Sequence, residues 1–362
     1  MLILLAVLLL LSTLLSVVLV LAVRTASRRL GFMDHPLPDH PPRPPIPFGG
    51  GIAIFLTFLA PVLLGMLAVS WFHTHGLPAW APVFLHDIQI YLTGALSTFG
   101  QLAVILAGAA VIVLLGLVDD HRRLSPIPKL VVEIVVAVAV VLAGVRVTAF
   151  VGHGLLGAVA TVVWIVAIIN AFNMLDNMDG LSAGVAAIIG VILAVVALQS
   201  HQFFIAALLA PLVGALLGFL VFNYPPASIY MGDAGSLFIG FMLSIISVLI
   251  TFNEGPESVR PVILPLLVFS VPLYDMCSVI LLRIRAGRRP WQGDRRHFSH
   301  RLVALGLSDR AAVAAIHLLT LGIGLSATLL YLITQPLGEV ITVVQAVVIL
   351  IVIVILEHVR SR

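Results

Sequence analysis

The chain has 362 residues, of which 61% are hydrophobic and only 10% are charged. Soluble domains carry roughly 25% charged residues, so this composition excludes a soluble enzyme and predicts a protein that crosses a lipid bilayer several times. The formal net charge is +3, but basic residues in a membrane protein mainly mark the loops that stay in the cytoplasm, so the charge does not indicate nucleic-acid binding.

A hydrocarbon core about 30 Å thick takes roughly 20 apolar residues per crossing. We therefore expect an all-α polytopic membrane protein with about eleven transmembrane helices, or ten as the alternative, built as a single domain over residues 1–362. The predicted spans are Leu2–Val23, a second that ends near Trp71, a third that ends at Asp119, and then Leu130–Ala143, Leu155–Ala171, Leu181–Leu198, Phe203–Val221, Leu237–Phe252, Pro261–Leu282, Ala311–Leu332 and Val340–Leu356. No basic residue precedes the first span, which predicts a retained helix and not a cleaved signal peptide.

The connecting segments indicate the membrane topology. Seven prolines lie between Pro36 and Pro47, which excludes a helix in the first loop. Basic residues concentrate in the first, third and ninth loops and in the carboxyl-terminal tail, whereas Arg146 and Arg260 fall on the other side. The odd-numbered loops are therefore predicted to be cytoplasmic, with the amino terminus outside and the carboxyl terminus in the cytoplasm. The predicted location is the cytoplasmic (inner) cell membrane, with multiple passes.

Carboxylates collect at the predicted cytoplasmic ends of the spans. Asp119 and Asp120 end the third span, Asp176 and Asp179 end the fifth, and Asp233 opens the eighth. A carboxylate at the membrane boundary costs several kcal/mol unless it is paired or bound to a metal. These residues therefore predict an active site at the cytoplasmic helix ends.

Amides accompany the second of these clusters. Asn170, Asn173, Asp176 and Asp179 fall at every third position, so on a helix they form one slowly winding polar row, which Gly180 then loosens or breaks. A helix cap with a solvated turn needs only one such residue. We interpret the row as part of the predicted site.

The segment Asn223–Ser236 places Asp233 just before a predicted helix start. Backbone N–H groups and the positive end of the helix dipole stabilise negative charge there, and Gly232 and Gly235 allow close approach of a phosphate or a metal. Hard oxygen donors without a zinc-type Cys and His set indicate Mg²⁺, with Mn²⁺ as the alternative, held by one or two carboxylates together with substrate phosphates. The pattern predicts phosphoryl chemistry.

Cationic side chains that suit phosphates lie near these acids. Lys129 is the only lysine of the chain, and Arg295, His297 and His300 belong to the run from Asp294 to Arg301. For the basic run Arg283–Arg289, positive-inside bias or contact with lipid headgroups is favoured over phosphate binding, which stays the alternative. Asp275, inside the ninth predicted span, is either a hydrogen-bonding partner or a wall of the site.

At these residues the sequence resembles the polyprenyl-phosphate N-acetylhexosamine-1-phosphate transferases over nearly the whole chain. The segments that carry the resemblance are Leu117–Asp120 with Lys129, Asn170–Leu181, Asn223–Ser236 and Asp294–His300. The first loop departs from the family, which usually has Arg-Lys and then His where this chain has Asp39, His40 and Pro42. Ser299 stands where several relatives have a further His.

The resemblance implies a reaction and its residues. It implies transfer of GlcNAc-1-phosphate from UDP-GlcNAc to undecaprenyl or another polyprenyl phosphate, with release of UMP. The chain lacks the three consecutive histidines typical of the UDP-MurNAc-pentapeptide branch, so the GlcNAc-1-phosphate branch is favoured. Phospho-MurNAc-pentapeptide transfer is the alternative. The metal ligands implied are Asp233, Asp120 and Asn173. Asp119 would accept a proton from the lipid phosphate or orient it, or else attack the donor covalently first.

The remaining implied contacts are with the substrates. Lys129, His297 and His300 would face the diphosphate, with His297 counted among the catalytic residues, while Asp179 would accept a hydrogen bond from the uracil. The other expected substrate-binding residues are Asn170, Asn173, Asp176, Asn223 and Arg295. The bilayer is the other expected partner, and the sequence leaves open whether the chain forms a homodimer.

Two other classes also place acids in membrane helices. A cation-coupled transporter builds ion sites from broken helices, but here the acids cluster at one face. An intramembrane aspartyl protease has paired Tyr-Asp and Gly-Asp motifs, similar to Tyr274-Asp275 and Gly232-Asp233, but the two elements stand here in the reverse order.

Overall fold

The computed structural model describes residues 1–35, 44–77, 92–147, 154–250, 260–332 and 336–359, and it is helical almost throughout. Its helices are α1 (Leu2–Leu30), α2 (Gly50–His75), α4 (Leu92–Ser97), α5 (Phe99–Arg122), α6 (Pro126–Leu142), α7 (Gly154–Leu175), α8 (Leu181–Gln199), α9 (Phe203–Asn223), α10 (Asp233–Leu249), α11 (Arg260–Val268), α12 (Ser270–Arg285), α13 (Phe298–Ala304), α14 (Asp309–Leu332) and α15 (Pro336–Val359). Two short strands, β1 (Met33–Asp34) and β2 (Ile46–Pro47), pair antiparallel.

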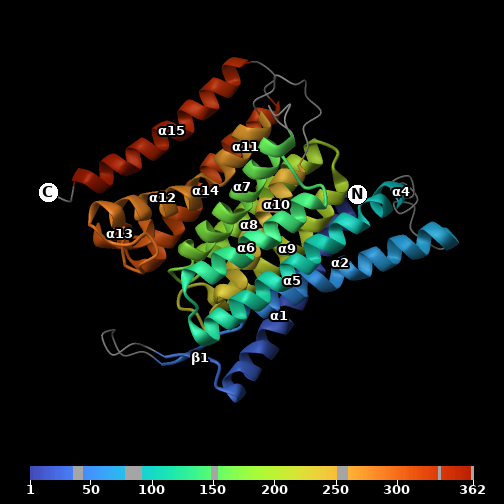
Figure 1. The fold of residues 1–362 in the computed structure, drawn as a ribbon, viewed down its shortest axis with the longest axis horizontal. Helices are drawn as coiled ribbons and strands as arrows, with labels where there is room; N and C mark the ends of the chain where they lie inside the picture. The colour runs from blue at the N-terminus through green and yellow to red at the C-terminus, as the bar shows by residue number, and fades with distance from the viewer. Residues whose placement is uncertain (36–43, 78–91, 148–153, 251–259, 333–335, 360–362) are drawn as a thin grey trace.

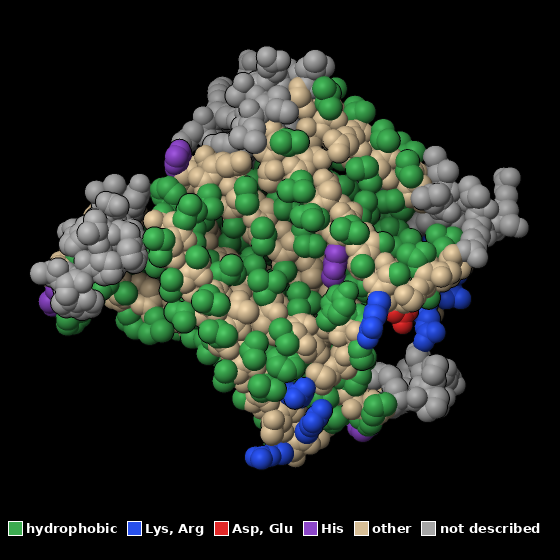
Figure 2. All heavy atoms as spheres, turned by 180° about the vertical axis from the view of Figure 1, so that it is seen from behind, with side chains coloured by type: hydrophobic (Ala, Val, Ile, Leu, Met, Phe, Trp, Pro, Cys, Tyr) green, Lys and Arg blue, Asp and Glu red, His purple; other side chains and the backbone are tan. Residues whose placement is uncertain are grey.

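The predicted all-α membrane protein is confirmed. Seven helices of the described chain are long and apolar enough to cross a membrane, namely α1, α2, α5, α7, α8, α9 and α14, and α10 and part of α15 form shorter apolar helices. Hydrophobic side chains cover most of the face in Figure 2, and Lys and Arg side chains lie along its margin. Each predicted span coincides with a helix, except that the ninth is divided between α11 and α12 at Phe269.

Helix α10 lies inside the bundle. Nearly all of its residues are buried, and it packs against α2, α5, α7 and α8 (Figure 1). Glycines allow this packing at the start of α10, because a Cβ on Gly116 of α5 would lie 2.3 Å from the backbone nitrogen of Ala234, and one on Gly51 of α2 would lie 2.2 Å from that of Gly235. The close approach places the carboxyl end of α5, with Asp119 and Asp120, directly beside Asp233.

The first loop is attached to the same region. The Tyr230 backbone N–H donates to the carbonyl of Pro47 at 2.8 Å, and the Gly50 N–H donates to the carbonyl of Tyr230 at 2.9 Å. The described ends of this loop form the β1–β2 pair and no helix, as the prolines predict. Asp39, His40 and Pro42 lie outside the described residues.

Candidate active site

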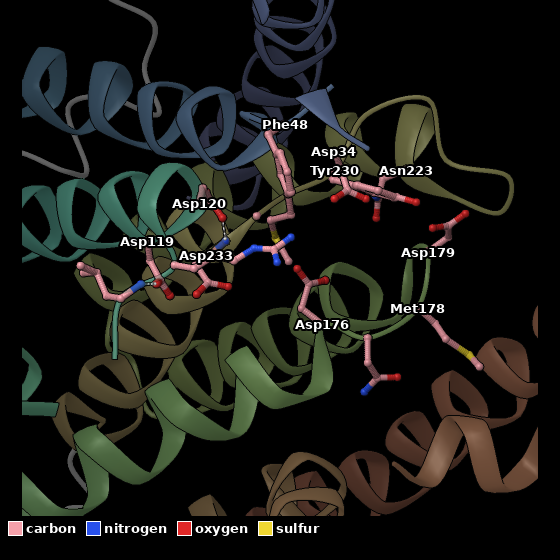
Figure 3. A pocket seen from close by; sticks show the side chains of 15 residues that line it. Asp34, Phe48, Asp119, Asp120, Asp176, Met178, Asp179, Asn223, Tyr230 and Asp233 are labelled. Atoms are coloured by element: carbon pink, nitrogen blue, oxygen red, sulfur yellow. Dashed lines mark hydrogen bonds between the residues drawn. The ribbon is translucent and has the colours of Figure 1, made fainter. Parts of the chain in front are cut away.

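A cavity of about 460 Å³ opens where the ends of α5, α7, α9 and α10 meet. Its lining includes six carboxylates, from Asp34, Asp119, Asp120, Asp176, Asp179 and Asp233, together with Arg123, Asn177, Asn223 and Tyr230. Figure 3 shows Asp119, Asp120 and Asp233 on one side, with Asp34, Tyr230, Asn223 and Asp179 on the other and Asp176 between the two groups. The predicted convergence of the three aspartate clusters is therefore present.

Asp120 caps the amino terminus of α10. Its Oδ1 accepts a hydrogen bond from the backbone N–H of Asp233 at 2.7 Å, and its Oδ2 accepts one from that of Ala234 at 3.3 Å. Gly232 has φ +74°, and a Cβ there would lie 2.5 Å from the Asp120 Oδ2, so this turn needs a glycine. Asp120 therefore fixes the position of Asp233, and each of its oxygens keeps one further lone pair for another ligand.

Lys129 bridges two of the aspartates. Its ammonium group, at the start of α6, donates to Asp119 Oδ2 and, at 2.8 Å, to Asp233 Oδ2. The backbone N–H of Leu124 donates to the other oxygen of Asp119 at 2.5 Å. The Asp233 side chain is 31% exposed and reaches the cavity. One cation thus offsets part of the repulsion between two facing carboxylates.

Asn173 joins α7 to the same aspartate. Its Nδ2 donates to Asp233 Oδ1 at 2.9 Å and to Ser236 Oγ at 3.1 Å. Asp233 is therefore held from α5 through the Asp120 cap, from α6 through Lys129 and from α7 through Asn173. It is the residue on which the three predicted motifs meet.

The polar row of α7 is shorter than predicted. The helix ends at Leu175, so Asp176 and Asp179 lie in the turn before α8, and Gly180 precedes α8 with φ +71°. Asp179 Oδ2 accepts a hydrogen bond from the backbone N–H of Ala227 at 2.8 Å. This contact holds the α7–α8 turn against the α9–α10 segment.

Asn223 also joins these two segments. Its Oδ1 accepts from the Gly180 N–H and its Nδ2 donates to the carbonyl of Ile229, both at 2.9 Å. Its side chain is buried, and the described contacts use both of its polar atoms. Asn223 lines the cavity, but this geometry gives it a role in shaping the cavity wall.

Asp176, in the turn after α7, has a strongly raised pKa. Burial by the surrounding turns, together with the negative charges of Asp233 and Asp120, raises the pKa of Asp176 well above its usual value, although its side chain still reaches the cavity. A cation that enters the cavity would therefore favour ionised Asp176.

Asn170 is not among the residues that line the cavity, and it pairs with Glu133, an acid that the motifs do not include. Its Nδ2 donates to Glu133 Oε2 of α6 at 2.5 Å and to the carbonyl of Val166 at 2.9 Å. Glu133 is completely buried, and its Oε1 has no hydrogen-bond partner among the described atoms. A carboxylate one helical turn after Lys129, inside a predicted span, was the signal that could have found it.

The segment from Asp294 to Arg301, which carries His297 and His300, contacts the turn between α7 and α8. His297 Nδ1 is 2.8 Å from Asp275 Oδ2, and the Phe298 N–H donates to Asp275 Oδ1 at 2.5 Å. Of the two hypotheses for Asp275, the structure therefore supports the hydrogen-bonding partner. Ser299 Oγ donates to Oδ1 of the cavity residue Asn177 at 2.5 Å.

The cationic residues of this segment stay outside the cavity lining. His297 is buried, His300 is half-buried and Arg295 is exposed. Burial and the positive charges of His297 and Arg295 lower the pKa of His300. Ser299 of this segment thus contacts a cavity residue, but neither His297 nor His300 lines the cavity with its six carboxylates.

Arg123 and Asp34 line the cavity, although the sequence pattern did not assign either of them to the site. Arg123 is one of the basic residues of the third loop, which predicted only the topology, yet it directly follows α5 with φ +48° and lines the cavity. Asp34, at the end of β1, reaches the cavity because the β1–β2 pair is attached to the α9–α10 segment. Neither position could be placed without the tertiary fold.

The side chains around the cavity can be compared with those that bind Mg²⁺ in other proteins. In the described part of the chain, no group of three or more His, Cys, Asp or Glu side chains is arranged to hold a metal ion by itself. Mg²⁺ is commonly held by one or two carboxylates plus substrate phosphates and water. Six carboxylates around one cavity fit that mode of binding, because an anionic substrate would enter such a cavity only with a cation.

Comparison with known proteins identifies the family. Residues 102–251 match the model of glycosyl transferase family 4, a region that contains Asp119, Asn173 and Asp233 but not His297. A protein of Bacillus subtilis, named "Probable undecaprenyl-phosphate N-acetylglucosaminyl 1-phosphate transferase", is 30% identical over 256 residues, which are 68% of this chain and 71% of that protein. The chain belongs to glycosyl transferase family 4.

Other relatives of this family 4 protein have related names. The decaprenyl-phosphate N-acetylglucosaminephosphotransferase of Mycobacterium tuberculosis is 29% identical over 328 residues, covering 82% of this chain and 75% of the relative. The undecaprenyl-phosphate alpha-N-acetylglucosaminyl 1-phosphate transferase of Pasteurella multocida is 28% identical over 310 residues, covering 82% and 78%. These matches favour the transferase over the transporter and protease hypotheses.

Proposed function

We propose that the protein transfers GlcNAc-1-phosphate from UDP-GlcNAc to a polyprenyl phosphate and releases UMP. The observation that carries the proposal is the bridge from Lys129 to Asp119 and Asp233, which joins the predicted motifs in one acidic cavity. The names of the relatives add the acceptor lipid and the transferred sugar phosphate. The donor nucleotide follows from the family.

The cavity is built to position two phosphate groups and to neutralise their charge. Arg123 lines the cavity and would contact a diphosphate, whereas Lys129 is not among the lining residues and would act through its bonds to Asp119 and Asp233. Both oxygens of Asp119 already accept a hydrogen bond. We therefore favour for Asp119 the orientation of the attacking lipid phosphate, which is largely ionised at neutral pH, over a covalent attack of its own.

The metal and the nucleotide contacts are part of the proposal. Asp233, Asp120 and the side-chain oxygen of Asn173 would hold Mg²⁺, and the ion would neutralise charge on the diphosphate. The uridine would lie on the side of the cavity where Asp179 is found, with Asp176 between it and the metal ligands. The membrane orientation, with the cavity facing the cytoplasm of the inner cell membrane, follows from the basic loops.

The test uses the purified protein in detergent with Mg²⁺ and undecaprenyl phosphate. UDP-GlcNAc and UDP-MurNAc-pentapeptide are offered separately while UMP and lipid products are measured. Release of UMP together with a GlcNAc-diphosphate lipid is expected. Product from the pentapeptide donor alone would assign the protein to the other branch, and turnover of neither donor would overturn the proposal.

A further inference from the structure

The exposed face of α12 changes from apolar to basic at its carboxyl end. Cys277, Leu281 and Ile284 are exposed and follow one another at helical spacing. Arg285, the last residue of α12, lies one turn after Leu281 and is exposed, and Arg288, in the turn that follows the helix, is also exposed. An apolar row that becomes basic within one turn marks the level where a helix leaves the hydrocarbon core.

The turn after α12 folds back onto this end of the helix. The buried Arg283 donates to the carbonyl of Pro290 at 2.7 Å and to Asp294 Oδ1 at 3.1 Å. The Gly287 N–H donates to the carbonyl of Ile284 at 2.9 Å, so the helix closes in a compact turn. Trp291 follows Pro290, whose carbonyl accepts the hydrogen bond from Arg283, and so it lies near the end of α12. Its surface is 58% exposed.

The arginines of this turn have no protein counter-charge in the described structure. Asp294 pairs with Arg283 and Arg296 instead. Arg285, Arg288 and Arg289 are exposed and belong to no ion pair among the described residues. Three like charges so close together repel one another and favour anionic partners.

We propose that Arg285, Arg288, Arg289 and Trp291, here called the α12 basic patch, bind the headgroups of anionic phospholipids at the bilayer surface. Trp is enriched at membrane interfaces, and juxtamembrane Lys and Arg attract anionic lipids. The apolar row that leads into the patch favours a bilayer over a soluble polyanion. In Figure 1, α12 and α13 lie toward one edge of the helix bundle.

The test measures which lipid lies next to Trp291. The full chain is placed in phosphatidylcholine vesicles that contain equal mole fractions of either brominated phosphatidylglycerol or brominated phosphatidylcholine. The quenching of Trp291 is obtained by subtracting the signal of the Trp291→Phe variant. Brominated phosphatidylglycerol is expected to quench Trp291 about twofold more than brominated phosphatidylcholine does, and added salt is expected to reduce the preference.

Charge variants separate binding from simple proximity to lipid. The variant with Arg285→Gln, Arg288→Gln and Arg289→Gln should lose the preference, while the matched triple Lys variant should keep it. Trp71, 61% exposed on α2 and outside the patch, is the control position and should show no change between the charge variants. Equal quenching by the two lipids, quenching by neither, or a preference that survives in the triple Gln variant would overturn the proposal.

Discussion

Replacing Lys129 by methionine tests the ion pairs that Lys129 forms with the cavity residues Asp119 and Asp233. Methionine is about as long as lysine and keeps an unbranched apolar stem, but the substitution removes the ammonium group that donates to Asp119 and Asp233. Hydrogen bonds to charged groups contribute about 1.5–3 kcal/mol each, and the 31% exposure of Asp233 places this pair at the lower end. Two such bonds give roughly 3 kcal/mol, which corresponds to about a hundredfold in rate if they are needed in the transition state.

The assay is the initial rate of UMP release at varied donor concentration, with the melting temperature of each variant measured in the same detergent. We expect kcat to fall about a hundredfold, with a smaller change in KM, because negative charge develops on the phosphate of UMP as it leaves and needs a cation nearby. Arg122→Gln removes a positive charge from an exposed neighbouring position and should leave kcat within about twofold. A folded Lys129→Met protein with wild-type turnover, or an equal loss in both variants, would refute this reasoning.

Three further predictions concern the acids around the cavity and behind it. Asp233→Asn should lower turnover by about a thousandfold or more, since a neutral amide is a poor Mg²⁺ ligand, and normal UMP release by a folded variant would remove Asp233 from the metal site. Glu133→Leu removes one of the two acceptors of the Asn170 amide and should lower the free energy of unfolding by about 1–3 kcal/mol in denaturant titrations. The double variant Glu133→Leu, Asn170→Leu should recover part of that loss, and a double variant no more stable than the single one would contradict the pairing. Asp294, whose pKa is held below its usual value by hydrogen bonds from Arg283 and Arg296 that outweigh the effect of burial, contributes stability that is present at neutral pH and lost as pH falls through the folded-state pKa. Asp294→Asn should therefore melt lower than wild type at pH 7, the gap should close below about pH 4, and a gap unchanged across that range would exclude the ion pair as its cause.

The sequence predicted the helices and the meeting of the acidic motifs well. Uninterrupted apolar runs specify spans directly, because backbone groups in lipid have to be satisfied within the helix. Asp119, Asp176 and Asp233 could be placed together because each closes or opens a span on the same predicted side of the membrane. This inference needed only span parity and the distribution of basic residues.

Contacts between helices could not be predicted in the same way. Nothing local shows that Asp120 caps α10, because the cap depends on the close approach of Gly116 to Ala234. The end of α7 at Leu175 depends on packing of the following turn, whereas the three-residue spacing suggested a continuous helix. The burial of Glu133 and the position of His297 outside the cavity lining likewise depend on tertiary packing, and not on local sequence.

The measurement that tests the central claim most directly follows the β-phosphorus of UDP-GlcNAc. With that atom radiolabelled and undecaprenyl phosphate as acceptor, transfer of a sugar phosphate moves the label into the lipid and releases unlabelled UMP. We predict lipid-bound label and UMP in equal amounts. Release of labelled UDP, with no label in the lipid, would show transfer of the sugar alone and would contradict the account.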